Sequence, residues 1–199
     1  MTRSSDEQTA RKRGASEQTR RQADKRQRFM ESDVALYGMF ISVAAVMSYL
    51  ESLVPIRLPA PGMKIGLANI VTVWVLYSMG IKPAAIISVL RVLLVGFLFG
   101  NLYSILFSLA GAAASLGVMY ALKKSKHFSV IGVSIAGGVT HNLAQLAVAM
   151  PVLENARLAY YLPALIIGGV AAGIAIGILG AVLYKKIKIL PSKGNGRNR

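Results

Sequence analysis

The sequence predicts an all-α membrane protein, a bundle of six transmembrane helices with both termini in the cytoplasm. The first observation is the composition: 54% of the 199 residues are hydrophobic, and only two carboxylates, Glu51 and Glu154, follow Asp33. The second is a series of long uncharged runs, because about 20 apolar residues let a helix cross the hydrocarbon core of a bilayer. The third is the uneven distribution of the 23 Lys and Arg residues between the connecting segments.

The uncharged runs, and the residues that interrupt them, define the predicted spans. The uncharged run 92–122 extends back through Arg91 to Pro83. This stretch is too long for one helix, and Gly100-Asn101 divides it near its middle. The predicted spans are 34–53, 64–80, 83–99, 102–122, 129–150 and 161–184. Span 64–80 is short, so we expect it to cross with little tilt or to be partly re-entrant.

The basic residues predict the orientation. An even number of spans places both termini on one side, and cytoplasmic loops carry an excess of Lys and Arg. With the N-terminus inside, the cytoplasmic segments hold 19 basic residues, against Arg57, Lys64 and Arg157 outside. Topology and attraction to anionic lipid thus explain most of the net charge of +15, so we expect no nucleic-acid partner.

Three segments follow along the chain. We expect residues 1–33 to form a basic cytoplasmic tail that is disordered or transiently helical. Residues 34–185 should form the six-helix membrane domain, and residues 186–199 a second basic cytoplasmic tail. The first tail has no apolar stretch before Val34, so it is not a signal peptide and the first helix should stay uncleaved. The chain has no cysteine, which excludes disulfides, thiolate metal sites and a cysteine nucleophile.

Small residues recur at helical spacing in three of the spans, and helices in lipid associate through the close approach of such residues. The pairs and triplets are Gly38/Ser42 in the first span, Ala110/Ala114 and Gly111/Ser115 in the fourth, and Gly169/Gly173/Gly177 in the last. They predict packing within the bundle. For the first-span stripe, the alternative is docking against a partner membrane protein.

Arg91 is the only charge predicted near mid-depth of a span. A charge in that position is costly, so it is either functional or paired. Glu51 pairs with it if Arg91 lies toward the outer half of its span. Otherwise a bound anion is the natural counter-charge, because a guanidinium binds phosphate or carboxylate in a fork.

A second polar group lies in the fifth span, where His141 and Gln145 share a helix face and Asn142 lies beside it. The group is either a ligand contact or a set of satisfied structural residues. A metal site is not expected, because the other histidine, His127, lies in a predicted cytoplasmic loop. No cofactor is expected either.

A third group surrounds the first outside loop, 53–63, which its three prolines should make rigid and extended. Lys64, Gly66 and Asn69 then open the second span, where free amides and a lysine could hold an anionic group. The alternative is a tight re-entry turn with Lys64 reaching the interface. The complete set of candidate ligand-binding residues is Lys64, Asn69, Arg91, Asn101, His141, Asn142 and Gln145.

Several catalytic signatures are absent from the membrane body. It has no Walker A loop, no glycine-rich dinucleotide turn and no Ser/His/Asp set. It also has no aspartate after Asp33, whereas Mg²⁺ bridging a diphosphate needs clustered carboxylates. The chain alone is therefore not expected to join isoprenyl diphosphates.

Two segments of the membrane body are distinctive, PGMKIGLAN at 61–69 and HNLAQ at 141–145. Together with the rest of residues 34–185, they resemble a bacterial membrane family called Gx transporter, or heptaprenyl diphosphate synthase component I. The six short helices are also similar to the S components of energy-coupling-factor transporters.

The resemblance to S components implies capture of a small isoprenoid or vitamin-like molecule in the bacterial cell membrane, with loop 53–63 as a lid. It also implies a partner, a membrane coupling subunit with ATPases. The synthase name implies the alternative, an accessory membrane subunit of a catalytic prenyltransferase.

Overall fold

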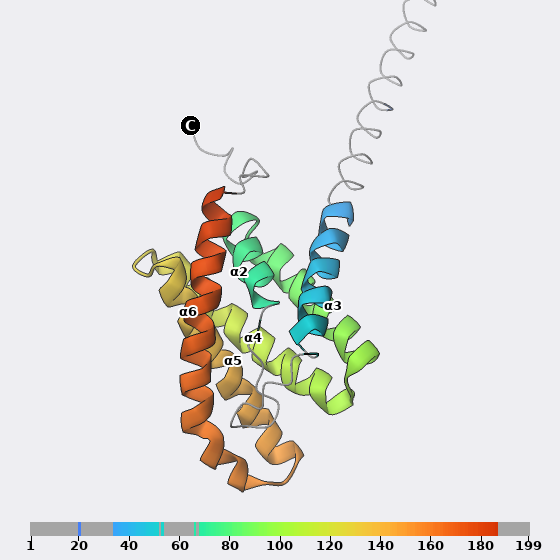
Figure 1. Cartoon of the computed structure of the whole chain (residues 1–199), viewed down its shortest axis with the longest axis vertical. Coiled ribbons are helices and arrows are strands. Elements are labelled where there is room, and N and C mark those ends of the chain that lie inside the picture. The colour runs from blue at the N-terminus through green and yellow to red at the C-terminus, as the bar shows by residue number, and fades with distance from the viewer. Residues whose placement is uncertain (1–19, 21–33, 52, 54–65, 67, 187–199) are drawn as a thin grey trace, which may run out of the picture. The chain divides into compact units, whose positions relative to one another are not determined.

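The computed structural model describes Arg20 and residues 34–51, 53, 66 and 68–186. The chain divides into two units, Met1–Met39 and Phe40–Arg199. Of the first unit, the described residues are Arg20 and the helical residues 34–39. The second unit contains the helical bundle shown in Figure 1, and its described residues form helices and turns without a strand.

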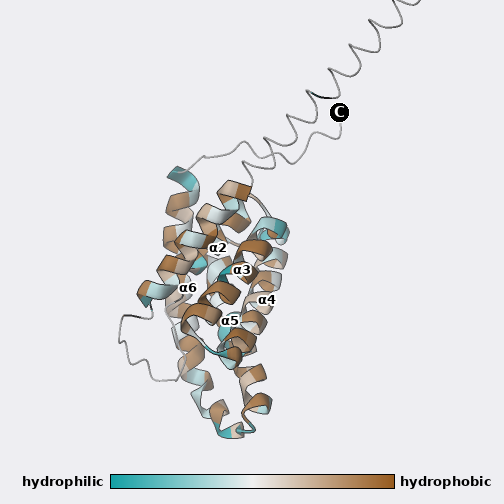
Figure 2. Cartoon of the chain, turned by 90° about the vertical axis from the view of Figure 1, so that its right-hand side faces the viewer, coloured by the Kyte–Doolittle hydropathy of each residue, from teal (hydrophilic) through white to brown (hydrophobic). Residues whose placement is uncertain are grey.

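The helices follow the predicted order. The first helix is Val34–Glu51. It is followed by α2 (Asn69–Ser78), α3 (Ile81–Phe99), α4 (Leu102–Ser125), α5 (Val130–Val152), the short 3₁₀ helix η1 (Ala156–Tyr161) and α6 (Leu162–Lys186). Among the described residues, five helices are long and apolar enough to cross a membrane, with η1 and α6 taken as one. Figure 2 shows apolar residues along these helices and hydrophilic residues mainly near their ends.

The second predicted span differs from the sequence expectation. Within the described residues, 64–80 contains only the ten-residue helix α2. At about 1.5 Å per residue this helix is about 15 Å long, half the thickness of a hydrocarbon core. Gly66 (φ +80°) and Gly80 (φ +99°) have left-handed backbone conformations on either side of it. Because residues 72–76 are all buried, α2 is a core element of the bundle.

The C-terminal ends of α2, α4 and α6 lie together. The C-terminal ends of α2 and α4 meet where Lys123 Nζ donates a hydrogen bond to the Leu76 carbonyl at 2.5 Å. The same ammonium lies 5.0 Å from the centre of the Tyr77 ring, which contacts Tyr184 of α6 at 5.8 Å between ring centres. The three helices α2, α4 and α6 therefore run the same way.

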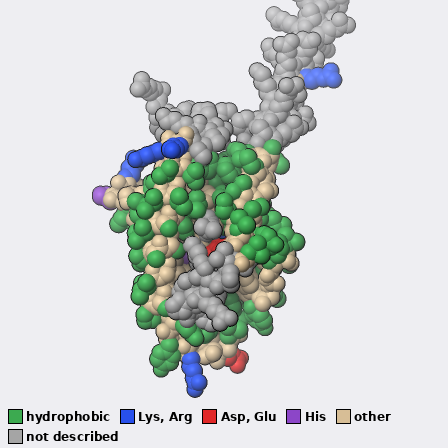
Figure 3. Space-filling model, in the orientation of Figure 1, with side chains coloured by type: hydrophobic (Ala, Val, Ile, Leu, Met, Phe, Trp, Pro, Cys, Tyr) green, Lys and Arg blue, Asp and Glu red, His purple; other side chains and the backbone are tan. Residues whose placement is uncertain are grey.

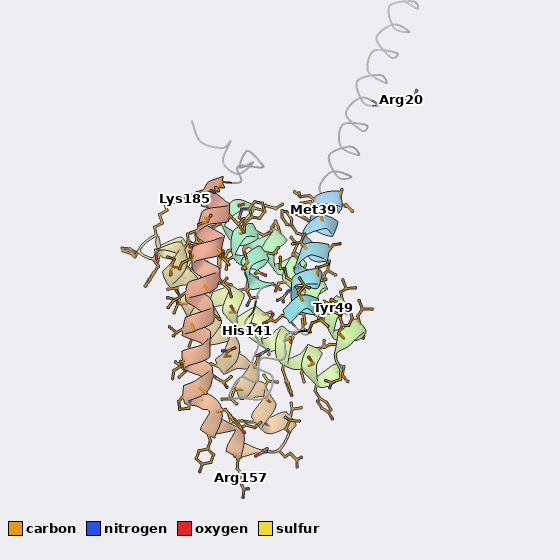
Figure 4. The ribbon with its side chains drawn as sticks, viewed as in Figure 1. Arg20, Met39, Tyr49, His141, Arg157 and Lys185 are labelled. Carbon is orange, nitrogen blue, oxygen red and sulfur yellow. The ribbon has the colours of Figure 1, made fainter. Side chains whose placement is uncertain are left out.

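Lysine and arginine residues mark the two ends of the bundle. Lys185 and Arg157 mark opposite ends in Figure 4. Because α4 and α6 end together, Lys123 and Lys124 lie at the same end as Lys185. Figure 3 shows hydrophobic side chains over the face between these ends. This separation agrees with the predicted topology, and the assignment of the lysine end to the cytoplasm stays a prediction.

The α3–α4 corner confirms the predicted helix break. Gly100 follows the last residue of α3, and Asn101 precedes α4 in an extended conformation. The Asn101 side chain accepts a hydrogen bond from the Ser104 amide at 2.8 Å, which caps the new helix.

The glycine stripe of α6 packs against α5 backbone to backbone. A Cβ added at Gly169 would lie 2.9 Å from the Val139 Cα, and one added at Gly173 would lie 2.5 Å from the Ile135 Cα. On the facing helix, a Cβ at Gly138 would lie 2.6 Å from the Gly169 carbonyl oxygen. The prediction that this stripe packs inside the bundle is confirmed.

Candidate functional site

Arg91 lies on α3 and joins three helices. Its Nη1 donates to Ser48 Oγ of the first helix at 3.5 Å, and its Nη2 donates to Asn69 Oδ1 of α2 at 3.4 Å. Both bonds are long, so they hold the guanidinium weakly. The Nε atom is buried and has no hydrogen-bond partner among the described residues. The guanidinium thus retains hydrogen-bonding capacity inside the bundle.

Glu51 lies at the end of the first helix and connects it to the start of α2. Its carboxylate accepts a hydrogen bond from the Gly66 amide, 15 residues later. It also interacts electrostatically with Arg91, although no direct ion pair joins these two described side chains. Glu51 therefore supplies a counter-charge to Arg91 at longer range, while its hydrogen-bonding oxygen is used by the backbone.

The polar residues of α5 face two neighbouring helices. The His141 ring lies against the Gly111 backbone of α4 and interacts electrostatically with Arg91. A Cβ at Gly111 would lie 2.9 Å from His141 Cε1 and 2.8 Å from Gln145 Cγ, so both side chains pack against α4. In Figure 4, His141 lies between the helices, well inside the two ends of the bundle. Asn142 instead donates to the Leu165 carbonyl of α6 at 2.8 Å.

We define the polar centre as Ser48, Glu51, Asn69, Arg91 and His141, since the interactions above connect them. Three predicted candidates, Asn69, Arg91 and His141, are thus brought together. Their contact with a ligand stays a prediction.

The other candidate residues lie outside the polar centre or outside the described residues. Asn142 is used between α5 and α6, and Gln145 lies beside His141 on Gly111. Asn101 is exposed at the α3–α4 corner, where its oxygen caps α4. Lys64 and nearly all of the predicted lid lie outside the described residues.

Sequence reasoning missed the hydroxyl residues of this region. Ser48, Thr72 and Ser88 are all buried. Each is three residues from a polar residue already considered: Ser48 from Glu51, Thr72 from Asn69 and Ser88 from Arg91. Residues three apart share a helix face, so this spacing is the signal that could have identified them.

The arrangement is suited to binding. Among the described residues, no group of three or more His, Asp or Glu side chains could hold a metal ion. In the polar centre, neutral oxygen atoms of Ser48 and Asn69 hold the Arg91 guanidinium. The Glu51 carboxylate and the His141 imidazole interact with it electrostatically. Such a site can recognise a polar or anionic group inside an apolar bundle.

A family model described as heptaprenyl diphosphate synthase component I matches residues 40–183, which is most of the chain. The chain belongs to this family. The component I match includes every residue of the polar centre and all of α2 to α5. It confirms the family resemblance noted from the sequence. No curated protein and no solved structure matches the chain significantly.

Proposed function

We propose that this component I family protein binds a small molecule at the polar centre and acts, in the manner of an S component, as the substrate-binding part of a membrane transporter. The observation that carries the proposal is Arg91, a cation inside an apolar bundle that is not used in a direct ion pair among the described residues. Charged groups in such surroundings are costly, so a guanidinium without a direct carboxylate partner favours a bound ligand.

The surroundings of the polar centre favour a ligand with a polar group and an apolar body. The helices that hold Arg91 also bury aliphatic side chains, among them Val73 and Leu76 of α2 and Ile87 of α3. An isoprenoid or vitamin-like molecule has this combination of a polar head and apolar atoms. Sites for such molecules are commonly apolar with a few placed polar groups.

Transport would require partner subunits. The sequence has no nucleotide-binding motif, so an energy source must come from another chain. A membrane coupling subunit with ATPases fits this need. The setting we propose is the bacterial cell membrane with the lysine end in the cytoplasm, as the distribution of basic residues predicts.

Native mass spectrometry of the protein extracted mildly from its own membrane tests the proposal. We expect a retained small molecule, together with partner chains, in the wild-type sample. Arg91→Met should lose the small molecule, while Arg157→Met, which removes an exposed arginine outside the polar centre, should keep it. Wild-type protein without any retained molecule, or equal retention by both variants, would refute binding at Arg91.

A second candidate function is an accessory membrane subunit of a polyprenyl diphosphate synthase. The family description favours it. Of the two carboxylates in the membrane body, Glu51 is bonded to the Gly66 amide and Glu154 lies in the turn after α5, so a catalytic partner must supply the magnesium ligands. Co-purification with a prenyltransferase, and a longer product when this chain is added, would support it. An unchanged product would exclude it.

A further inference from the structure

Thr72 is a buried hydroxyl residue in the middle of α2. Only 3% of its surface is exposed, and its Oγ1 has no hydrogen-bond partner in the part of the chain that the structure describes. Buried polar atoms are nearly always hydrogen-bonded, because leaving one without a partner costs free energy. A hydroxyl kept at this position therefore needs an explanation beyond packing.

Thr72 lies three residues after Asn69, a residue of the polar centre, on the same helix. Asn69, one helical turn earlier on α2, accepts the hydrogen bond from Arg91 Nη2. Asn69 and Thr72 share a face of α2 because they are three residues apart. Arg91 Nε, on the side chain that bonds Asn69, is also buried without a partner among the described residues, as are Trp74 Nε1 and Ser78 Oγ further along α2. Among the described residues, α2 and α3 thus each carry a donor group without an acceptor. Asn69 shares a helix face with the first and bonds the side chain that carries the second.

We propose that Thr72 is a ligand contact and that the polar centre recognises an oxyanion, the phosphate or carboxylate group of the ligand. This inference rests on the proposed function and names the chemical group that the site takes. Arg91 Nε–H can only donate, and the threonine O–H can donate, so their common partner must supply acceptor oxygens. A negatively charged oxygen makes the strongest such bonds with a guanidinium.

Ser78 offers a matched control on the same helix. Its Oγ is also buried and without a partner in the described residues. It lies nine residues after Asn69, which at about 100° per residue places it on the opposite side of α2. Removal of this hydroxyl should therefore leave the polar centre unchanged.

The test uses the full-length protein in lipid nanodiscs and three probes: farnesyl phosphate, inorganic phosphate and farnesol. We expect farnesyl phosphate to bind and farnesol not to bind. Thr72→Val, which keeps the shape and removes the hydroxyl, should weaken farnesyl phosphate binding about tenfold, the loss of one hydrogen bond to a charged group. Ser78→Ala should bind like the wild type.

A stability measurement separates a ligand contact from a structural hydroxyl. Without ligand, Thr72→Val should unfold at the same temperature as the wild type or higher, because it removes a buried polar atom that has no partner. Binding of inorganic phosphate with the same dependence on Thr72 would show that the anion suffices. Binding of farnesyl phosphate alone would show that the prenyl chain is also needed. Either result supports oxyanion recognition.

Three results would overturn the inference. If Thr72→Val binds farnesyl phosphate normally while Arg91→Met does not, Thr72 is not a contact and the proposed function stands. If Thr72→Val lowers the unfolding temperature of the ligand-free protein, the hydroxyl is structural. If the wild type binds neither phosphate probe but retains another molecule from its own membrane, the recognised group is not an oxyanion of this kind, and binding at the polar centre is still supported.

Discussion

Replacing Gly173 with alanine should loosen the pairing of α5 and α6. The added Cβ would lie 2.5 Å from the Ile135 Cα, 3.0 Å from the Ile135 nitrogen and 3.0 Å from the Ser134 carbonyl oxygen. All three atoms belong to the backbone of α5, so no side-chain rotation can relieve the overlap. The two helices must move apart.

The required movement determines the size of the effect. Carbon atoms pack optimally at about 3.5–4.0 Å, so the overlap with Ile135 Cα is about 1–1.5 Å. Overpacking of this kind typically costs about 1–3 kcal/mol. We expect a value near the upper end, because a shift at Gly173 also disturbs the contacts of Gly169 and Gly177 with the same helix. For a chain of this size, about 3 kcal/mol corresponds to roughly 6–12 °C in melting temperature.

Thermal unfolding in a mild detergent, followed by circular dichroism, measures this loss. Gly117→Ala on α4 is the matched control, since a Cβ there meets no atom within 4 Å and alanine favours a helix. We expect the control to melt at or above the wild-type temperature. A Gly173→Ala protein as stable as Gly117→Ala would refute the claim that these backbones are in contact.

Three further substitutions test other parts of the fold by the same unfolding measurement. Asn101→Ala should lower the free energy of unfolding by about 1 kcal/mol because it removes the cap of α4. Asn101→Asp retains an acceptor oxygen, so its free energy of unfolding should stay close to that of the wild type. Gly66→Ala should lower the free energy of unfolding by about 1–2 kcal/mol, because alanine is strained in the left-handed backbone conformation at φ +80°. A Gly66→Ala protein as stable as the wild type would contradict that conformation. Lys123→Met should lower the free energy of unfolding by about 1–2 kcal/mol because it removes the hydrogen bond to the Leu76 carbonyl. Lys124→Met, at an exposed position, should change it by less than about 0.5 kcal/mol.

Most of the helices could be predicted because their signals are local. Gly100-Asn101 ends one helix and caps the next within a few residues, so the break appears in the sequence itself. The α6 glycines likewise recur every four residues. This spacing indicates a face that packs against another helix, even before that helix is identified. The second span was predicted less well, because its apolar composition does not reveal that Gly66 and Gly80 have left-handed conformations.

The candidate site was predicted only in part. Arg91 and His141 stand out as polar residues in apolar runs, and both belong to the polar centre. Asn101 has the same appearance in sequence but serves as an exposed helix cap. Thr72 was missed because a threonine in a membrane helix commonly bonds to its own backbone, and only its burial without a partner distinguishes it.

The amino-acid sequence was enough to predict an apolar helical chain of the component I family with most of its charges in the tails and loops. Those properties depend on composition and on neighbouring residues along the chain. The three-dimensional arrangement was needed to see that α2 is a short buried helix and that Arg91 bonds Ser48 and Asn69 rather than a described carboxylate. Contacts between helices depend on their rotation and depth, and packing against every neighbour at once sets both.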